Sequence, residues 1–259
     1  MAAVPTRPER SRSFGAIAAD YDRLRPPAAE AAVDWLVPGH REVLVDLGAG
    51  TGLLTRALAR RAGRVVAVEP DERMRAFLRE RSPGVQVVPG QGEQIPLADG
   101  AADGVFAASA WHWMDQARAV PEIARVLRDG GRLGLIWTAR EPGIEWIRAG
   151  EWFREAYARA EPSDVAEPRD AQGRRLVHLP AGSPFVNIET VTFHYSRPMT
   201  PGQIVDMLTT YSAVITADPD LVALGRARGV AALAAEFPGA ATIDLPVRSY
   251  CWRADRASR

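Results

Sequence analysis

Short apolar runs recur along the first half of the chain, and a segment with helical spacing of apolar residues follows most of them. The runs lie at 43–47, 65–68, 85–88, 104–108 and 132–137. Runs of this length and composition predict strands that are buried on both faces, as in parallel sheets. Strands that alternate with helices predict an α/β fold.

The second half contributes two further strands and several helices. Residues 189–195 and 242–252 alternate between apolar and polar side chains, while 143–159, 201–212 and 220–237 have helical spacing. Together these patterns predict a Rossmann-like domain, with a seven-stranded, mostly parallel sheet and helices on both faces.

A glycine cluster follows the first strand directly. Gly48, Gly50 and Gly52 separate the run at 43–47 from a helical pattern that begins near Thr51. A strand, a glycine turn and a helix together direct backbone N–H groups and a helix dipole at a ligand. Glycine also lets the ligand approach the backbone closely. The pattern predicts a nucleotide-type binding turn.

The spacing of this turn separates the possible ligands. A dinucleotide fingerprint has a third glycine where this chain has Leu53, and a P-loop needs a lysine, which the chain lacks. The sequence DLGAGTG from Asp46 to Gly52 closely resembles the first motif of class I S-adenosylmethionine-dependent methyltransferases. That resemblance implies S-adenosylmethionine as cofactor and S-adenosylhomocysteine as product. The turn residues it places at the cofactor are Asp46, Gly48, Ala49, Gly50 and Gly52.

Glu69 ends the second strand, about 20 residues beyond the glycine turn. An acidic side chain at this offset accepts hydrogen bonds from ribose hydroxyls. The segment VVAVEPDERM resembles the family's second motif, which implies that Glu69 and Pro70 contact the cofactor. An exposed glutamate at a strand end is the alternative.

The segment before and through the fourth strand resembles a further motif of the family, which surrounds the adenine. The resemblance places Gln91, Gly92 and Glu93 there, although many relatives have aspartate at the position of Gln91. Glutamine can still hydrogen-bond to an adenine edge. Ser109 follows the fourth strand, and ligands bind at the carboxyl ends of such strands. We therefore expect Ser109 at the cofactor too.

His112 lies between two tryptophans just after the fourth strand. It is a candidate general base near neutral pH. Trp111 and Trp113 are candidate substrate-binding residues, since an indole face attracts a cation such as a sulfonium. The alternative is that these aromatic side chains only pack beneath the cofactor.

Segments outside the central motifs complete the predicted organisation. An N-terminal pattern similar to one in many small-molecule methyltransferases implies that Tyr21 and Arg25 reach the cofactor, although core packing of Tyr21 and solvation of Arg25 are equally open. Trp146 is a further candidate substrate-binding residue. We predict a disordered tail at 1–13 and a single domain at 14–259. Within it we expect cap helices at 14–40, a cofactor core at 41–140, and lid segments at 141–185 and 200–240.

Composition excludes several classes of function. Acidic and basic residues number 32 each, which gives no electrostatic signature of nucleic-acid or anionic-membrane binding. Without lysine, Schiff-base chemistry on a lysine side chain is impossible. The single cysteine favours a reducing, cytoplasmic compartment. No apolar run reaches the roughly 18 residues of a membrane span. The four histidines are scattered, which argues against a metal site.

These observations favour methyl transfer to a small-molecule acceptor by in-line displacement. Natural-product intermediates, organic acids and amines all stay open as acceptors, as do O-, N- and C-methylation and the oligomeric state. Two alternatives stay open as well. One is a cofactor-binding protein with a regulatory or other role. The other is a nicotinamide-dependent oxidoreductase, against which Leu53 counts.

Overall fold

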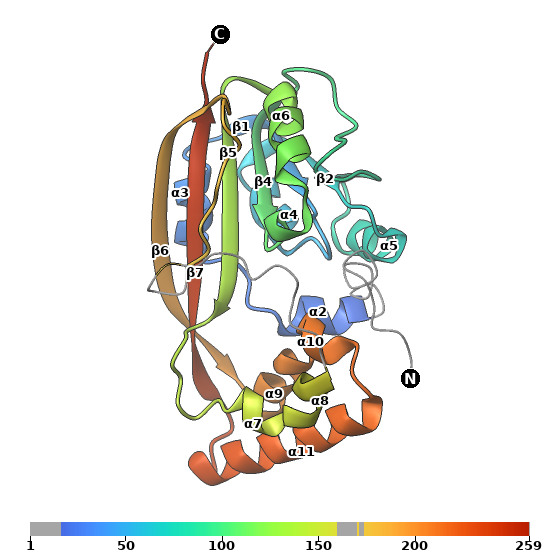
Figure 1. Cartoon of the computed structure of the whole chain (residues 1–259), viewed down its shortest axis with the longest axis vertical. Helices are drawn as coiled ribbons and strands as arrows, with labels where there is room; N and C mark the ends of the chain where they lie inside the picture. Colours follow the sequence, from blue (N-terminus) through green and yellow to red (C-terminus); the bar gives the residue numbers. More distant parts are fainter. Residues whose placement is uncertain (1–16, 160–169, 171–173, 259) are drawn as a thin grey trace. The chain divides into compact units, whose positions relative to one another are not determined.

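The computed structural model describes residues 17–159, 170 and 174–258. Within these residues, seven strands form one sheet in the order β3-β2-β1-β4-β5-β7-β6 (Figure 1). The strands are β1 (Arg41–Leu47), β2 (Ala62–Val68), β3 (Gln86–Val88), β4 (Ala102–Ala108), β5 (Leu127–Arg140), β6 (Phe185–Met199) and β7 (Ile243–Arg256). The predicted tail at 1–13 lies outside the described residues.

Strands β1 to β5 run parallel to one another, and β7, the next strand in the sheet after β5, runs in the opposite direction. β2 pairs with β1 and β3, and β4 pairs with β1 and β5, all in parallel register. β7 is antiparallel to β5, because Arg132 contacts Asp255 whereas Thr138 contacts Ser249. The prediction of a Rossmann-like, mostly parallel sheet is confirmed.

Helices connect the strands: α2 (Ala18–Leu24), α3 (Glu30–Leu36), α4 (Leu53–Ala59), α5 (Glu72–Arg81), α6 (Gln116–Val126), α7 (Ala149–Trp152), α8 (Arg154–Arg159), α9 (Pro201–Thr209), α10 (Ser212–Ile215) and α11 (Pro219–Glu236). Asp71 caps α5 by accepting hydrogen bonds from the N–H groups of Arg73 and Met74. Thr200 and Gln203 form a capping box on α9.

Two predicted helices have different bounds in the structure. The helix expected at 143–159 is restricted to α7 and α8, because Gly143 has a positive φ of 73° and a break at Phe153 separates the two. The sequence also predicts a short helix at 119–128, before the glycines at 130 and 131, but α6 begins earlier, after the cap Asp115, and ends at Val126. The next residues belong to β5 instead of a terminating loop.

The chain packs as two compact units. The first contains residues 1–26, 140–168 and 195–247, and the second contains 27–139, 169–194 and 248–259. The predicted lid at 200–240 falls in the first unit, whereas the segment at 141–185 is divided between the two. The first unit has its own apolar core, which includes Phe153, Ile204 and Leu233.

In the second unit the sheet is buried on both faces. Leu44 and Phe106 pack with α3 and α4 on one face, and their neighbours Val45 and Val105 pack with α6 on the other. This alternation is the reason that each strand appears in the sequence as a continuous apolar run.

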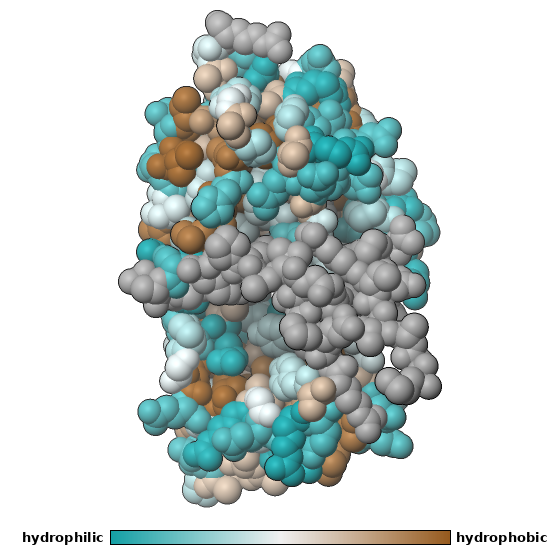
Figure 2. Space-filling model, in the orientation of Figure 1, coloured by the Kyte–Doolittle hydropathy of each residue, from teal (hydrophilic) through white to brown (hydrophobic). Residues whose placement is uncertain are grey.

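The edge strand β6 retains some apolar surface. Val186 is 44% and Ile188 56% exposed, and Figure 2 shows brown, apolar surface along this strand. Asn187 lies between them with a positive φ of 54°. Such an interruption makes an edge strand a poorer template for pairing with another chain. Within the described residues, no helix is long and apolar enough to cross a membrane.

Candidate functional site

The glycine turn leads from β1 into α4 at the carboxyl edge of the sheet. Gly48, Gly50 and Gly52 all have positive φ, at 68°, 56° and 86°. The N–H groups of Gly48 and Ala49 both donate to the carbonyl oxygen of Val68, at 2.8 and 3.1 Å. Side chains rarely tolerate these backbone conformations, so the glycines determine the shape of the turn.

The three glycines have different surroundings. A Cβ atom on Gly48 would lie 2.6 Å from Cβ of Ala110, and one on Gly52 would lie 3.0 Å from Cγ of Leu78. A Cβ atom on Gly50 would meet nothing within 4 Å. Gly48 and Gly52 therefore allow close packing inside the protein, whereas Gly50 borders open space.

Glu69 is fixed against this turn. Its side chain is buried, with 7% exposure of the residue, and its Oε2 accepts a hydrogen bond of 2.9 Å from the N–H of Gly50. Its Oε1 accepts one of 2.9 Å from the N–H of Asp71. Burial raises the pKa of Glu69, and the two backbone donors oppose that shift. The next residue, Pro70, is exposed, and its carbonyl oxygen accepts from Arg75.

Asp46 is fully buried at the end of β1. Its Oδ2 accepts a hydrogen bond of 2.5 Å from Oγ1 of Thr55, while its Oδ1 has no partner among the described residues. Burial raises the pKa of Asp46 to about 7, and the nearby charge of Glu69 acts in the same direction. Oγ1 of Thr51, in the glycine turn that follows β1, is likewise buried without a described partner. Buried polar atoms usually have partners, so two unpartnered atoms so close in the chain favour a ligand.

The segment from Gln91 to Glu93 is tied to the residues that follow β4. A Cβ atom on Gly92 would lie 2.5 Å from Sδ of Met114, and Oε1 of Glu93 accepts a 2.5 Å hydrogen bond from the N–H of Asp115. Gln91 is exposed and pairs through its backbone with Gln94. The carboxylate of Glu93 thus holds the loop in place.

The carboxyl end of β4 is strained and aromatic. Ser109 has a positive φ of 52°, and its N–H donates to the carbonyl oxygen of Ile136 at 2.9 Å. Non-glycine residues in this conformation are uncommon and occur often at functional sites. The half-buried rings of His112 and Trp113 lie 4.9 Å apart, centroid to centroid.

Trp111 is placed differently from these two neighbours. It is only 2% exposed and packs in the core of the second unit. With its amide oriented to satisfy both neighbours, Gln116 accepts from the indole N–H of Trp111 at 3.0 Å and donates to the carbonyl oxygen of His178 at 3.0 Å. In this structure Trp111 is a buried core residue whose indole N–H is bonded to Gln116, and substrate contact by Trp111 stays a prediction.

Three predicted site residues belong to the first unit. The guanidinium of Arg25 lies 5.0 Å from the ring centroid of Tyr21 and 4.0 Å from that of Tyr211, and it donates to the carbonyl oxygen of Thr210. Trp146 packs edge-to-face on Phe237. The structure gives these side chains packing roles within their own unit, and their ligand roles stay predictions.

Several residues of the site had no recognisable signal in the sequence. Thr55 holds the buried carboxylate of Asp46, and Ala110 and Met114 pack against Gly48 and Gly92. Their residue types are ordinary, and only the folded chain brings them beside the turn. A small residue at position 110 was the one available hint, since a glycine turn needs a small neighbour.

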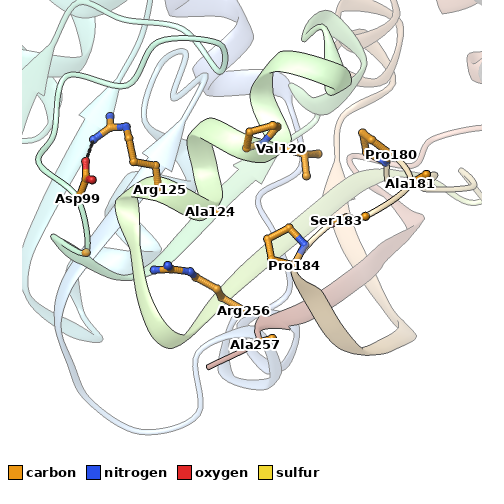
Figure 3. A pocket seen from close by; sticks show the side chains of 13 residues that line it. Asp99, Val120, Ala124, Arg125, Pro180, Ala181, Ser183, Pro184, Arg256 and Ala257 are labelled. Atoms are coloured by element: carbon orange, nitrogen blue, oxygen red, sulfur yellow. Dashed lines mark hydrogen bonds and ion pairs between the residues drawn. The ribbon is translucent and has the colours of Figure 1, made fainter. Parts of the chain in front are cut away.

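A cavity of about 420 Å³ lies elsewhere in the second unit, at the amino edge of the sheet (Figure 3). It is lined by the turn before β4, the later half of α6, residues 180–184 and the end of β7. The side chain of Arg125 points toward Asp99 in Figure 3, and the two form an ion pair at 2.7 Å. It also bonds to Glu122, while Arg256 bonds to the carbonyl oxygen of Leu127. This cavity is separate from the glycine turn.

Comparisons with known proteins identify the family of this chain. A family model described as a methyltransferase domain matches residues 45–135. An uncharacterized methyltransferase of Mycobacterium tuberculosis is 36% identical over 254 residues, which cover 97% of this chain and 99% of the relative. The chain belongs to the class I S-adenosylmethionine-dependent methyltransferases. It is a methyltransferase, as the sequence motifs predicted.

Two further comparisons extend this assignment. A malonyl-[acyl-carrier protein] O-methyltransferase of Methylococcus capsulatus is 34% identical to this methyltransferase over 185 residues, covering 65% of this chain and 66% of the relative. The solved structure of a protein of Anaeromyxobacter dehalogenans, assigned as a type II methyltransferase, superposes with a TM-score of 0.63 at 23% identity. It covers 90% of this chain and 97% of its own, and it supports the fold.

Proposed function

We propose that this methyltransferase binds S-adenosylmethionine at the glycine turn of the second unit and transfers its methyl group to a small-molecule acceptor. Glu69 would hold the ribose hydroxyls, and the turn from Gly48 to Gly52 would enclose the methionine part. Gln91, Gly92 and Ser109 would line the adenine side. Pro70 and Glu93 would support this wall of the site.

One observation carries the proposal: the carboxylate of Glu69 is bonded to the N–H of Gly50, and the space beside Gly50 is open. A fixed carboxylate still has lone pairs for two vicinal hydroxyl groups. The unpartnered Oδ1 of Asp46 suits an ammonium group such as that of the methionine part. The donor and acceptor set therefore fits this cofactor.

The residues of the site would act mainly by positioning. When bound, the cofactor supplies an electrophilic methyl group, which passes to a lone pair of the acceptor while S-adenosylhomocysteine departs. Alignment of two reactants can contribute about 7–11 kcal/mol to the acceleration in favourable cases. His112, half-buried beside Trp113, would accept a proton where the acceptor is a hydroxyl group or a carbon acid. An ionised carboxylate would not require that base.

Calorimetric titration of both S-adenosylmethionine and S-adenosylhomocysteine tests the cofactor assignment. We expect Glu69→Ala to weaken binding by about 1–3 kcal/mol, because hydrogen bonds to a charged group are lost. Glu80→Ala, which removes an exposed carboxylate from α5, is the matched control and should bind like the wild type. Absence of binding to the wild-type protein would refute the proposal.

Two measurements separate the alternatives. Transfer of a labelled methyl group to an acceptor distinguishes an enzyme from a protein that binds the cofactor for regulation. Titration with nicotinamide dinucleotides tests the oxidoreductase alternative, which the glycine spacing disfavours. The single cysteine, Cys251, is buried and free, and we further propose a cytoplasmic setting.

A further inference from the structure

Near the start of α5, Arg75 is buried against the segment that follows β2. The residue is 8% exposed, and its Nη1 donates to the carbonyl oxygens of both Glu69 and Pro70, at 2.7 Å each. Its Nη2 forms an ion pair with the carboxylate of Glu72, whose side chain is exposed. These three acceptors hold the guanidinium in one place, directly behind the residue that forms the wall of the glycine turn.

The two carbonyl groups that Arg75 binds lie on either side of the α-carbon of Pro70. The ring of proline fixes its φ angle, whereas its ψ angle can rotate. Because one nitrogen of Arg75 meets both carbonyl oxygens, it fixes ψ as well. Arg75 thereby sets the plane of the peptide group that joins Pro70 to Asp71.

The N–H of this same peptide group belongs to Asp71 and donates to Oε1 of Glu69, at 2.9 Å. A peptide group is planar, and in the trans form its N–H and its C=O point in opposite directions. A guanidinium bound to the carbonyl oxygen of Pro70 therefore directs the N–H at the far end of the group toward the carboxylate. Hydrogen bonds in such a chain polarise one another, so the charged donor also strengthens the bond to Glu69.

The charge of Arg75 acts on Glu69 in the same sense as this geometry. Burial raises the pKa of Glu69 and the carboxylate of Asp71 raises it further, whereas the positive charge of Arg75 lowers it. Only the ionised carboxylate can accept hydrogen bonds at both oxygens without also acting as a donor. Arg75 therefore favours the form of Glu69 that can accept from two hydroxyl groups.

We propose that Arg75 is a positioning residue for the cofactor, which it never touches: through the peptide group between Pro70 and Asp71 it holds the carboxylate of Glu69 in place for the ribose hydroxyl groups. This inference rests on the proposed function, in which Glu69 binds those hydroxyl groups. It adds a residue on α5 whose effect reaches the ribose and no other part of the cofactor.

Calorimetric titration of the full chain tests this proposal with S-adenosylhomocysteine and with its 2′,3′-dideoxy analogue, which lacks the ribose hydroxyl groups. We expect Arg75→Met to weaken binding of S-adenosylhomocysteine about tenfold and of the analogue by no more than about twofold. Arg75→Lys keeps the charge and should show the same selectivity with a smaller loss, which provides the comparison if Arg75→Met does not fold. Arg79→Met removes an arginine that also pairs with Glu72, and it should bind both ligands like the wild type.

A double-mutant cycle with Glu69→Ala shows whether Arg75 acts through that carboxylate. Arg75→Met should cost about tenfold in S-adenosylhomocysteine affinity in the wild-type background but no more than about twofold in Glu69→Ala, since the effects of residues that act together are not additive. Equal losses for the two ligands, additive losses in the cycle, or wild-type affinity in both Arg75 variants would overturn the inference and leave the proposed function intact. Absence of S-adenosylhomocysteine binding to the wild-type protein would instead refute the proposed function and, with it, this role of Arg75.

Discussion

In the second unit, Arg125 at the amino edge of the sheet and Asp46 at the carboxyl edge differ in how completely their side chains are paired, although Oγ of Ser183, beside the amino-edge cavity, also has no described partner. At the amino edge, beside a cavity of about 420 Å³, Arg125 bonds to Asp99, to Glu122 and to two backbone carbonyl groups. At the carboxyl edge, Asp46 and Thr51 each leave a buried oxygen unpartnered among the described residues. Ser109 there has a strained backbone.

Under the proposed function, cavity size is a poor guide to the ligand site of this protein. Charged groups that are already paired stabilise the fold and offer little to a ligand, because a ligand would have to displace their partners. An unpartnered oxygen of a buried carboxylate, such as Oδ1 of Asp46, is a group that a cationic ligand can satisfy. Asp46 has the second arrangement, and the residues that resemble the family's motifs lie at the same carboxyl edge.

Substitution of the turn glycines should give the largest effects. Gly48→Ala should destabilise the protein by about 2–4 kcal/mol, because a left-handed backbone and a clash with Ala110 act together. Gly50→Ala shares the positive φ but has no clash, so it should destabilise by only about 1–2 kcal/mol. Its Cβ enters the open space and should reduce cofactor affinity about tenfold or more. Urea unfolding measures the change in stability, and calorimetry measures the change in cofactor affinity. Wild-type cofactor affinity in Gly50→Ala would contradict a ligand beside this glycine.

Replacement of Arg125, at the amino edge, should lower the stability of the protein without lowering its affinity for the cofactor. Arg125→Met loses charged hydrogen bonds to Glu122 and Asp99 and should cost about 1–3 kcal/mol in urea unfolding. Cofactor affinity should stay within about twofold of the wild type, since the paired edge is separate from the glycine turn. Arg118→Met, on the exposed face of the same helix, is the control for loss of charge. A large loss of cofactor affinity in Arg125→Met would break the comparison.

The contributions of Asp46 and Glu122 to the free energy of unfolding should change with pH in opposite directions. The folded-state pKa of Asp46 is raised, so its contribution to stability is present at low pH and is lost as pH rises through about 7. The pKa of Glu122 is lowered by Arg125, so its contribution is lost only as pH falls below the ordinary glutamate range. Between pH 5 and 7, wild-type stability should fall relative to Asp46→Asn, by up to about 1.4 kcal/mol per pH unit. Urea unfolding of both proteins at several pH values measures this, and parallel pH profiles would show that Asp46 does not titrate there.

The sequence predicted the parts of the site that are local in the chain. The glycines of the turn and the acid at the end of β2 occupy positions that strand, turn and helix geometry requires, and the structure brings Glu69 to the N–H of Gly50 as that geometry implies. Whether these residues bind a cofactor stays a prediction. The first five strands were predicted because burial on both faces leaves a continuous apolar run, and the last two because their apolar and polar residues alternate.

The remaining features depend on contacts between distant segments. Trp137 meets Tyr250 only because β7 returns antiparallel beside β5, and no periodicity in either segment shows that pairing. Trp111 and Trp113 are two residues apart, yet a turn of 3-10 helix buries one and leaves the other half-buried. The short bounds of α7 and α8 follow from local breaks that helical spacing alone does not reveal.

The division of β5, β6 and β7 between the two units has a consequence for engineering this enzyme. The first unit is assembled from three separate stretches of chain, and each of these strands contributes residues to both units. No single contiguous exchange of gene segments can therefore transplant the first unit from one relative to another. Recombination between homologues would have to replace the three stretches together, with crossovers placed inside continuous strands, where a change of register would disrupt the sheet.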